Sequence, residues 1–335
     1  MPYRILVVGP SWVGDMVMAQ SLFMALKQQH KHCAIDVLAP NWSLPILERM
    51  PEVRKGIAMP FVHGQFDFKG RKELGISLRS EQYDQAILLP NSWKSAITPY
   101  FANIPKRTGY VGEMRWGLLN DSRKLDKKHL TKTVQRFVAL ARPPNNELPE
   151  IPLPRLLIDP VSVEDTKKEF SLDAIEGTVL GLCPGAEYGP AKRWPEERYA
   201  EVAKQAIQQG WQVLLFGSAK DEPVTKVIND MVGGECHDFA GKTSLPQALD
   251  LMSLCDVVVS NDSGLMHVAA ALDIKTVAVY GSSDPHFTPP LHAEAEVVSL
   301  GLSCSPCFKR ECPLVHLDCL VKIPASRISK IVFDS

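Results

Sequence analysis

Short apolar runs alternate with helical patterns along the first half of the chain. Residues 5–9 form an apolar run that ends in glycine. Apolar side chains then repeat with helical spacing up to Leu26, and a second run follows at 35–39, which predicts a strand–helix–strand unit. Further strands are expected at 86–89 and near Gly109, with helices at 72–80, 92–101 and 130–141.

The same alternation restarts in the second half. Strands are expected at 179–183, 212–216, 257–260 and 276–280, and helices at 197–209, 245–254 and 263–272. Between them, six prolines at 143, 144, 149, 152, 154 and 160 disfavour regular structure and indicate a linker. We therefore predict two doubly wound, parallel α/β domains, residues 1–155 and 156–335.

Composition and charge exclude several classes of protein. The 335 residues are 45% hydrophobic and 22% charged, as in ordinary globular chains, and no apolar run is long enough to span a bilayer. The net charge of -1 does not suit a general nucleic-acid binder, and no secretory signal is evident, so we expect a cytoplasmic protein. Residues 61–142, however, hold 15 Lys and Arg against 7 Asp and Glu. That surplus favours an anionic partner, although a solvated basic face is the alternative.

The loop after the first predicted strand departs from the familiar phosphate-binding loops. Gly9 and Gly14 have the spacing of a P-loop, but Asp15 and Met16 stand where that loop carries Lys and Ser or Thr. A carboxylate there would repel phosphate. Asp15 is better suited to take a proton from a hydroxyl group, with simple capping of the helix as the alternative.

Two later loops favour phosphate binding. Residues 184–195 combine a Gly-Ala turn with Lys192 and Arg193, and exposed backbone N–H groups beside fixed cations bind phosphate oxygens. Residues 260–267 end a very apolar strand and begin a helix, whose unpaired N–H groups form an anion site. His267 could bind the same anion or be a packed core histidine.

Other polar groups follow strand ends. Asp221 or Glu222, after Gly217, could accept bonds from ribose hydroxyls. In the basic first half, Asn91, Lys94, Arg107 and Arg115 lie near aromatic residues, a mixture suited to a phosphorylated sugar-lipid.

Four cysteines gather near the carboxyl end. Cys304, Cys307, Cys312 and Cys319 lie within sixteen residues, with His316 among them. The spacing permits a structural zinc site, which we do not favour over free thiols or a reversible disulfide. There is no clear Asp-x-Asp metal pair either, so we expect no metal in the reaction.

With these motifs in view, the chain closely resembles the ADP-heptose:lipopolysaccharide heptosyltransferases over nearly its whole length. The most specific stretches are residues 9–15, 183–187, 189–195 and 261–272. The resemblance implies the GT-B architecture, in which two Rossmann-like domains face a central cleft, with the acceptor on the first domain and the nucleotide-sugar on the second.

The resemblance also implies roles for individual residues. The catalytic aspartate falls on Asp15 and the diphosphate-binding lysine on Lys192. Donor contacts are expected at Gly185, Ala186, Glu187, Lys192, Arg193, Gly217, Asp221, Asp262, Ser263, Gly264 and His267. Acceptor contacts are expected at Ser11, Trp12, Gly14, Asn91, Lys94, Arg107 and Arg115. The cysteine segment matches no catalytic part of the family.

The implied reaction is inverting transfer of L-glycero-D-manno-heptose from ADP-heptose to the first heptose of a heptosylated Kdo2-lipid A acceptor, at the cytoplasmic face of the inner membrane. Direct transfer to Kdo is the nearest alternative. A Rossmann oxidoreductase or epimerase is disfavoured because neither half carries G-x-G-x-x-G after a strand. A non-catalytic nucleotide-sugar or lipid-binding protein is the remaining alternative.

Overall fold

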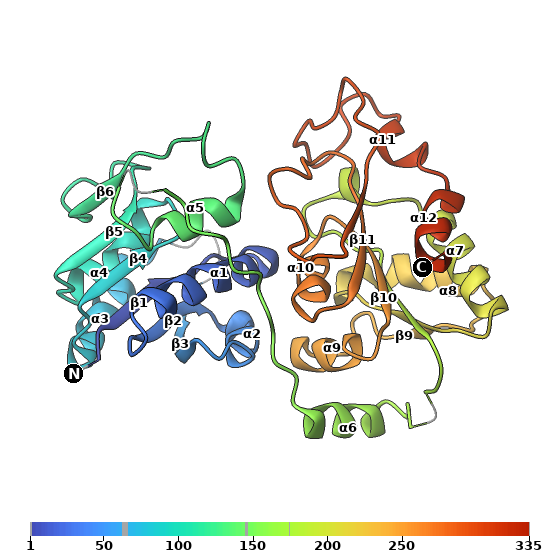
Figure 1. Ribbon diagram of the computed structural model, residues 1–335, viewed down its shortest axis with the longest axis horizontal. Helices are drawn as coiled ribbons and strands as arrows, with labels where there is room; N and C mark the ends of the chain where they lie inside the picture. Colours follow the sequence, from blue (N-terminus) through green and yellow to red (C-terminus); the bar gives the residue numbers. More distant parts are fainter. Residues whose placement is uncertain (1, 62–65, 145–146, 174, 335) are drawn as a thin grey trace. The chain divides into compact units, whose positions relative to one another are not determined.

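The computed structural model consists of two compact units, Met1–Pro154 and Arg155–Ser335. It describes residues 2–61, 66–144, 147–173 and 175–334 (Figure 1). The division falls one residue before the predicted boundary. Within the described part of the proline-rich stretch, regular structure resumes only at α6 (Pro160–Glu169), where Asp159 caps the helix by accepting a bond from the Val161 N–H.

The first unit contains a six-stranded parallel sheet with strand order β3-β2-β1-β4-β5-β6. Its strands are β1 (Arg4–Val8), β2 (Ala34–Pro40), β3 (Val53–Met59), β4 (Gln85–Leu88), β5 (Lys106–Tyr110) and β6 (Asp121–Arg123). This is the Rossmann order, which reverses direction between the first and fourth strands, here β1 and β4. The α/β prediction is confirmed for this unit.

Helices cover the first sheet. The long helix α1 (Val13–Gln29) packs beside α5 (Thr133–Ala139) (Figure 1), and the remaining helices are α2 (Leu44–Glu48), α3 (Phe68–Ser77) and α4 (Ile97–Phe101). Residues Ile5 to Val8 of β1 are at most 1% exposed, as expected for a strand with helices on both faces. The predicted helices at 72–80 and 92–101 each include a short 3₁₀ segment, Leu78–Glu81 and Trp93–Ala96.

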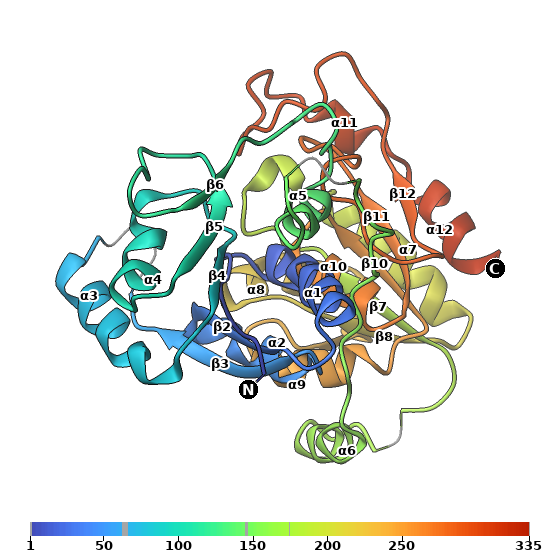
Figure 2. The same ribbon diagram turned by 60° about the vertical axis from the view of Figure 1, so that its left-hand side comes forward.

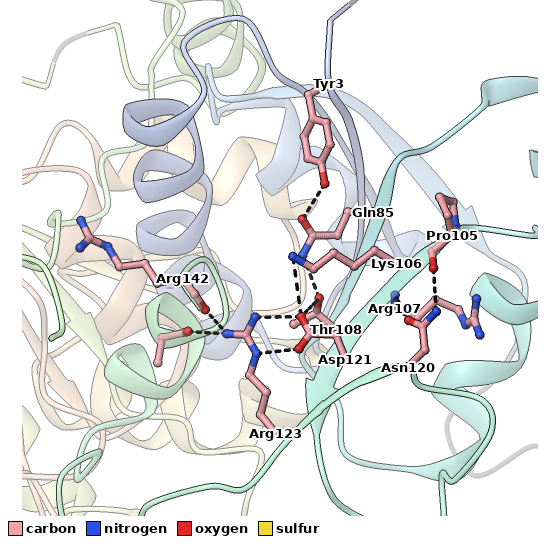
Figure 3. Close-up of polar contacts among 11 residues, drawn as sticks. Tyr3, Gln85, Pro105, Lys106, Arg107, Thr108, Asn120, Asp121, Arg123 and Arg142 are labelled. Atoms are coloured by element: carbon pink, nitrogen blue, oxygen red, sulfur yellow. Dashed lines mark hydrogen bonds and ion pairs between the residues drawn. The ribbon is translucent and has the colours of Figure 1, made fainter. Parts of the chain in front are cut away.

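A chain of polar side chains joins four neighbouring segments of the first sheet (Figure 3). Tyr3 donates to Gln85 (3.2 Å), Gln85 donates to Thr108 (2.8 Å), and Thr108 donates to Asp121 (2.8 Å). Arg123 completes the chain with a 2.9 Å ion pair to Asp121. Because the bonds from Tyr3 to Asp121 each join two different segments, they favour one strand register.

The second unit repeats the design. Its parallel sheet has strand order β12-β11-β10-β7-β8-β9, so the reversal falls between β7 and β10. The strands are β7 (Val179–Cys183), β8 (Gln212–Leu215), β9 (His237–Asp238), β10 (Val257–Asn261), β11 (Lys275–Val279) and β12 (Glu296–Val298). The helices are α6, α7 (Glu196–Gln208), α8 (Glu222–Met231), α9 (Leu245–Met252), α10 (Gly264–Ala271), α11 (Asp318–Val321) and α12 (Ala325–Phe333).

Candidate functional site

The predicted residues gather mainly at the carboxyl edges of the two sheets. Parallel sheets bind ligands there, next to the point where strand order reverses. In the first unit that point separates the loop after β1 from the loop after β4, and in the second it separates the loop after β7 from the loop after β10. Each unit therefore presents one candidate half-site.

The loop after β1 places Asp15 in the first turn of α1. Trp12 occupies the N-cap position and is 44% exposed, Ser11 and Asp15 are partly buried, and Gly14 is buried. Asp15 is thus not the N-cap residue but the third residue of the helix. The helix N-terminus favours its negative charge.

The structure brings Asn91 and Arg115 together at the same edge. The Arg115 guanidinium donates to Asn91 Oδ1 (3.3 Å), to the Pro90 carbonyl (2.8 Å) and to the Tyr110 carbonyl. Arg115 is only 3% exposed, and its burial lowers the pKa of the guanidinium, with Glu113 opposing that effect. Arg115 therefore holds the ends of β4 and β5 in place. Lys94 lies in the next turn and is partly exposed.

Arg107 lies elsewhere. It follows the first residue of β5, and its guanidinium donates to the Ile104 and Leu118 carbonyls at 2.6 Å each. Because Ile104 precedes the strand, this group lies toward the amino edge of the sheet, opposite the edge that carries Asn91. The structure does not bring Arg107 to the other predicted acceptor residues.

In the second unit, Asp221 packs between two glycine loops. A Cβ on Gly185 would lie 2.4 Å from the Asp221 carboxyl carbon, and one on Gly217 would lie 2.8 Å from the Asp221 Cβ. The Asp221 carboxylate accepts bonds from the Ser218 N–H and hydroxyl, at 3.0 and 2.8 Å. At 8% exposure it is engaged in holding the loops, while the neighbouring Glu222 is exposed.

Asn261, the last residue of β10, is a site residue that sequence reasoning did not single out. Its side-chain amide donates to the Pro184 carbonyl (2.6 Å), and its carbonyl oxygen accepts from the Trp194 N–H and the Tyr199 hydroxyl (3.0 Å each). Asn261 is fully buried. One side chain thus fixes both ends of the loop 184–194 to the strand that leads into Asp262.

Lys192 lies against this arrangement. Its ammonium forms a 2.5 Å ion pair with Asp262 and lies 5.1 Å above the centre of the Tyr188 ring. The Asp262 carboxylate is 5% exposed and the Lys192 side chain 17% exposed, so the cation remains accessible from one side. The structure brings these two predicted donor residues together.

The helix α10 begins beside this ion pair. Ser263 is its N-cap residue with no side-chain capping bond, and Gly264 is its first residue. His267, one turn in, is buried; burial lowers its pKa to about 4, with Asp262 raising it and Lys192 lowering it further. His267 is therefore neutral at pH 7, so its ring can donate a hydrogen bond without adding a charge.

The other predicted donor residues line the loop after β7. Ala186 is buried, Arg193 lies 3.7 Å from Asp221, and Glu187 forms an exposed ion pair with Lys220 at 2.6 Å. Glu187 is therefore a carboxylate of this loop that solvent can reach. The Arg193 guanidinium lies next to the Asp221 carboxylate.

The four clustered cysteines are free thiols around a small cavity of about 20 Å³, which His316 also lines. Burial raises the pKa of Cys319, and the nearby sulfurs of Cys304, Cys307 and Cys312 add to that effect. Across the described ranges, no three His, Cys, Asp or Glu side chains are arranged to hold a metal ion.

Taken together, the second unit offers the partly exposed side chain of Lys192, the N–H groups at the start of α10 and a neutral imidazole, which suit the phosphates of a nucleotide. The first unit offers a carboxylate at a helix start near buried polar loops, which suits proton abstraction.

Comparisons with known proteins show the family of this chain. The sequence model of glycosyltransferase family 9 (heptosyltransferase) matches residues 71–317. Lipopolysaccharide heptosyltransferase 2 of Salmonella typhimurium is 52% identical over 307 residues, covering 89% of this chain and 88% of that protein. Lipooligosaccharide heptosyltransferase 2 of Haemophilus influenzae is 50% identical, with the same two shares covered.

A solved structure of a heptosyltransferase has the same fold as this chain. The Escherichia coli ADP-heptose lps heptosyltransferase II is 44% identical, with a TM-score of 0.87 over 98% of this chain and 97% of that one. Matches of this extent are inconsistent with an oxidoreductase or a passive binding protein. This chain is a glycosyltransferase enzyme and belongs to glycosyltransferase family 9, the heptosyltransferases.

Proposed function

We propose that this protein transfers L-glycero-D-manno-heptose from ADP-heptose to the first heptose of the Kdo2-lipid A inner core in lipopolysaccharide biosynthesis. The observation that carries this proposal is the 52% identity, over 89% of the chain, to a lipopolysaccharide heptosyltransferase 2. Lipopolysaccharide heptosyltransferase 1 of Pseudomonas aeruginosa matches less well, at 30% identity over 36% of the chain.

The proposed reaction is a single displacement. Asp15 takes the proton of the acceptor hydroxyl as its oxygen attacks the anomeric carbon, and the bond from that carbon to the diphosphate breaks as ADP leaves with the electron pair. One attack from the opposite side inverts the anomeric centre. The proposal requires no metal ion, because protein cations and dipoles can offset the charge of the leaving group.

Lys192 and the start of α10 supply that charge. The Lys192 ammonium is held by Asp262 and is accessible, so a diphosphate oxygen can approach it without displacing a solvated, mobile side chain. The N–H groups at the helix start add further donors. His267, as a neutral donor, contributes a hydrogen bond to the same anion.

The acceptor assigns the protein a place in the cell. Kdo2-lipid A is anchored in a bilayer, so we place the enzyme at the cytoplasmic face of the inner membrane as a peripheral protein. In the described part of the chain, no helix is long and apolar enough to cross a bilayer.

A single assay tests the reaction. Purified protein is incubated with ADP-heptose and either Kdo2-lipid A or its monoheptosylated form, and mass spectrometry follows the lipid. We expect addition of one heptose to the monoheptosylated lipid; addition to Kdo2-lipid A alone would contradict the proposed acceptor.

A variant tests the base. Asp15→Asn keeps the shape of the side chain but cannot accept the proton, so turnover should fall by about 100-fold or more. Glu48→Gln, an exposed carboxylate on α2 of the same unit, is the control and should behave as wild type. A near-normal rate for folded Asp15→Asn would refute the assignment.

A further inference from the structure

The first unit carries a groove lined by aromatic rings that the proposed reaction does not use. Phe66 stacks on Trp93 at 5.7 Å between ring centres, and Phe68 meets Phe101 edge-on at 5.8 Å. The groove has a volume of about 320 Å³. We call it the aromatic groove, lined by Phe68, Trp93, Ile97, Tyr100, Phe101, Trp116, Gly117 and Leu118.

The large apolar side chains of this region are unusually exposed. Trp116 is 74% exposed and Met114 72%, both in the loop between β5 and β6, while Phe68 and Tyr100 are each 42% exposed. Burying such a side chain is worth about 1.5–3 kcal/mol, so folding alone would favour covering them. An exposed apolar patch of this kind marks a surface that a partner covers.

Cations surround the same rings. Lys72 lies 5.5 Å above the centre of the Phe101 ring, and Arg107 lies 5.4 Å above that of Tyr100. Lys69, the second residue of α3, has a side chain that is 87% exposed, and the region 61–142 carries the surplus of positive charge. Exposed Trp and Tyr beside Lys and Arg are typical of proteins that lie at a bilayer interface, where rings enter the headgroup level and cations meet anionic lipids.

The position of the groove fits such a partner. Helices α3 and α4 lie side by side (Figure 2). Phe68 of α3, three residues of α4 and the loop residues 116–118 are among those that line the groove. Trp93, which lines the groove, lies between the predicted acceptor residues Asn91 and Lys94 in the chain. A lipid-anchored acceptor bound at this edge would therefore have its bilayer next to the exposed rings.

We propose that the aromatic groove docks the first unit on an anionic bilayer, with Trp116 and Met114 entering the boundary between headgroups and acyl chains. This inference rests on the proposed glycolipid acceptor, because only an acceptor held in a bilayer gives the docking a purpose. Its main test, vesicle binding, needs neither sugar donor nor acceptor, so the two proposals can fail separately.

The experiment is vesicle co-sedimentation of the full-length protein. Vesicles of phosphatidylglycerol and phosphatidylethanolamine should bind it, binding should weaken with added salt, and neutral phosphatidylcholine vesicles should bind it much less. The double variant Met114→Ser/Trp116→Ser should lose at least about 10-fold in vesicle affinity. Val315→Ser, an exposed apolar residue of the second unit, is the matched control and should bind as wild type.

Two further measurements complete the test. The thermal midpoint of the double variant should equal that of wild type, because both side chains are exposed, and Lys69→Glu should weaken binding to anionic vesicles independently. Turnover on a de-acylated, water-soluble acceptor should be unchanged in the double variant. Three results would each overturn the proposal. The double variant could bind vesicles as tightly as wild type, the wild type could bind neutral vesicles as tightly as anionic ones, or the double variant could lose turnover on the soluble acceptor by as much as it loses vesicle affinity.

Discussion

Asn261 offers the sharpest test of how the donor half-site is held together. Its side chain bonds Pro184, Trp194 and Tyr199 from within the core. Replacing it with leucine keeps the volume and removes all three bonds. The Tyr199 hydroxyl retains the Cys183 carbonyl at 3.4 Å, so two groups, the Pro184 carbonyl and the Trp194 N–H, lose their partner.

The cost follows from those two groups. A buried polar group without a partner costs about 1–3 kcal/mol, so Asn261→Leu should lower the free energy of unfolding by about 2–6 kcal/mol. Tyr199→Phe removes the hydroxyl's bonds to Asn261 and to the Cys183 carbonyl, but it leaves the Asn261 oxygen paired with the Trp194 N–H, so it should cost about 1 kcal/mol. We therefore expect the free energy of unfolding to decrease from wild type to Tyr199→Phe to Asn261→Leu.

Urea unfolding measures the stabilities, and calorimetric titration with ADP measures the consequence for the site. We expect Asn261→Leu to bind ADP at least about 10-fold more weakly, because the loop that carries Lys192 loses both anchors. Tyr199→Phe should bind ADP nearly as wild type. If Asn261→Leu unfolded within about 1 kcal/mol of wild type and bound ADP normally, the loop would be held by other contacts and the reasoning would be wrong.

Three further predictions address the charges of the site. Lys192→Met should weaken ADP-heptose binding by about 10-fold or more in a titration, because it removes the accessible cation, whereas Lys226→Met on the exposed face of α8 should not. The pKa of His267 is lower in the folded protein than in the unfolded chain, so the unfolded chain takes up a proton first as pH falls below 6.5, which destabilises the fold. Between pH 7.5 and 5, the free energy of unfolding of the wild type should therefore fall by about 2 kcal/mol more than that of His267→Gln, as measured by urea unfolding. Turnover should be unchanged after EDTA treatment, and a loss restored by added metal would contradict the metal-free reaction.

Local patterns predicted the central elements well. The strands β1, β7, β10 and β11 are buried on both sides and bounded by turn residues, so their apolar runs stand out in the sequence. The edge strand β3 was not predicted, because two of its residues, Arg54 and Lys55, are charged and only Ile57 is buried. The predictions also omitted the helix α8, although its buried residues Val224 and Ile228 repeat with helical spacing.

The sequence predicted those parts of the candidate site that lie within one continuous loop, but not the contacts between distant loops. Lys192 and Asp262 were each identified from their own loops, but their ion pair joins residues 70 positions apart. Asn261 was overlooked because its partners lie up to 77 positions away, and nothing local marks an asparagine as an anchor. The sequence suggested that Arg107 and Arg115 bind a ligand. It could not show that both guanidinium groups donate hydrogen bonds to backbone carbonyls, because such contacts have no local sequence pattern.

The contact between Gly185 and Asp221 sets a constraint on evolution as well as on folding. Any side chain larger than hydrogen at 185 meets the carboxylate at 2.4 Å, so neither position can change alone without moving a loop. Across homologues, the two columns should vary as a pair, with bulk appearing at one only where it is lost at the other. Efforts to alter donor preference by directed evolution would therefore gain more from exposed neighbours such as Glu187 than from this coupled pair.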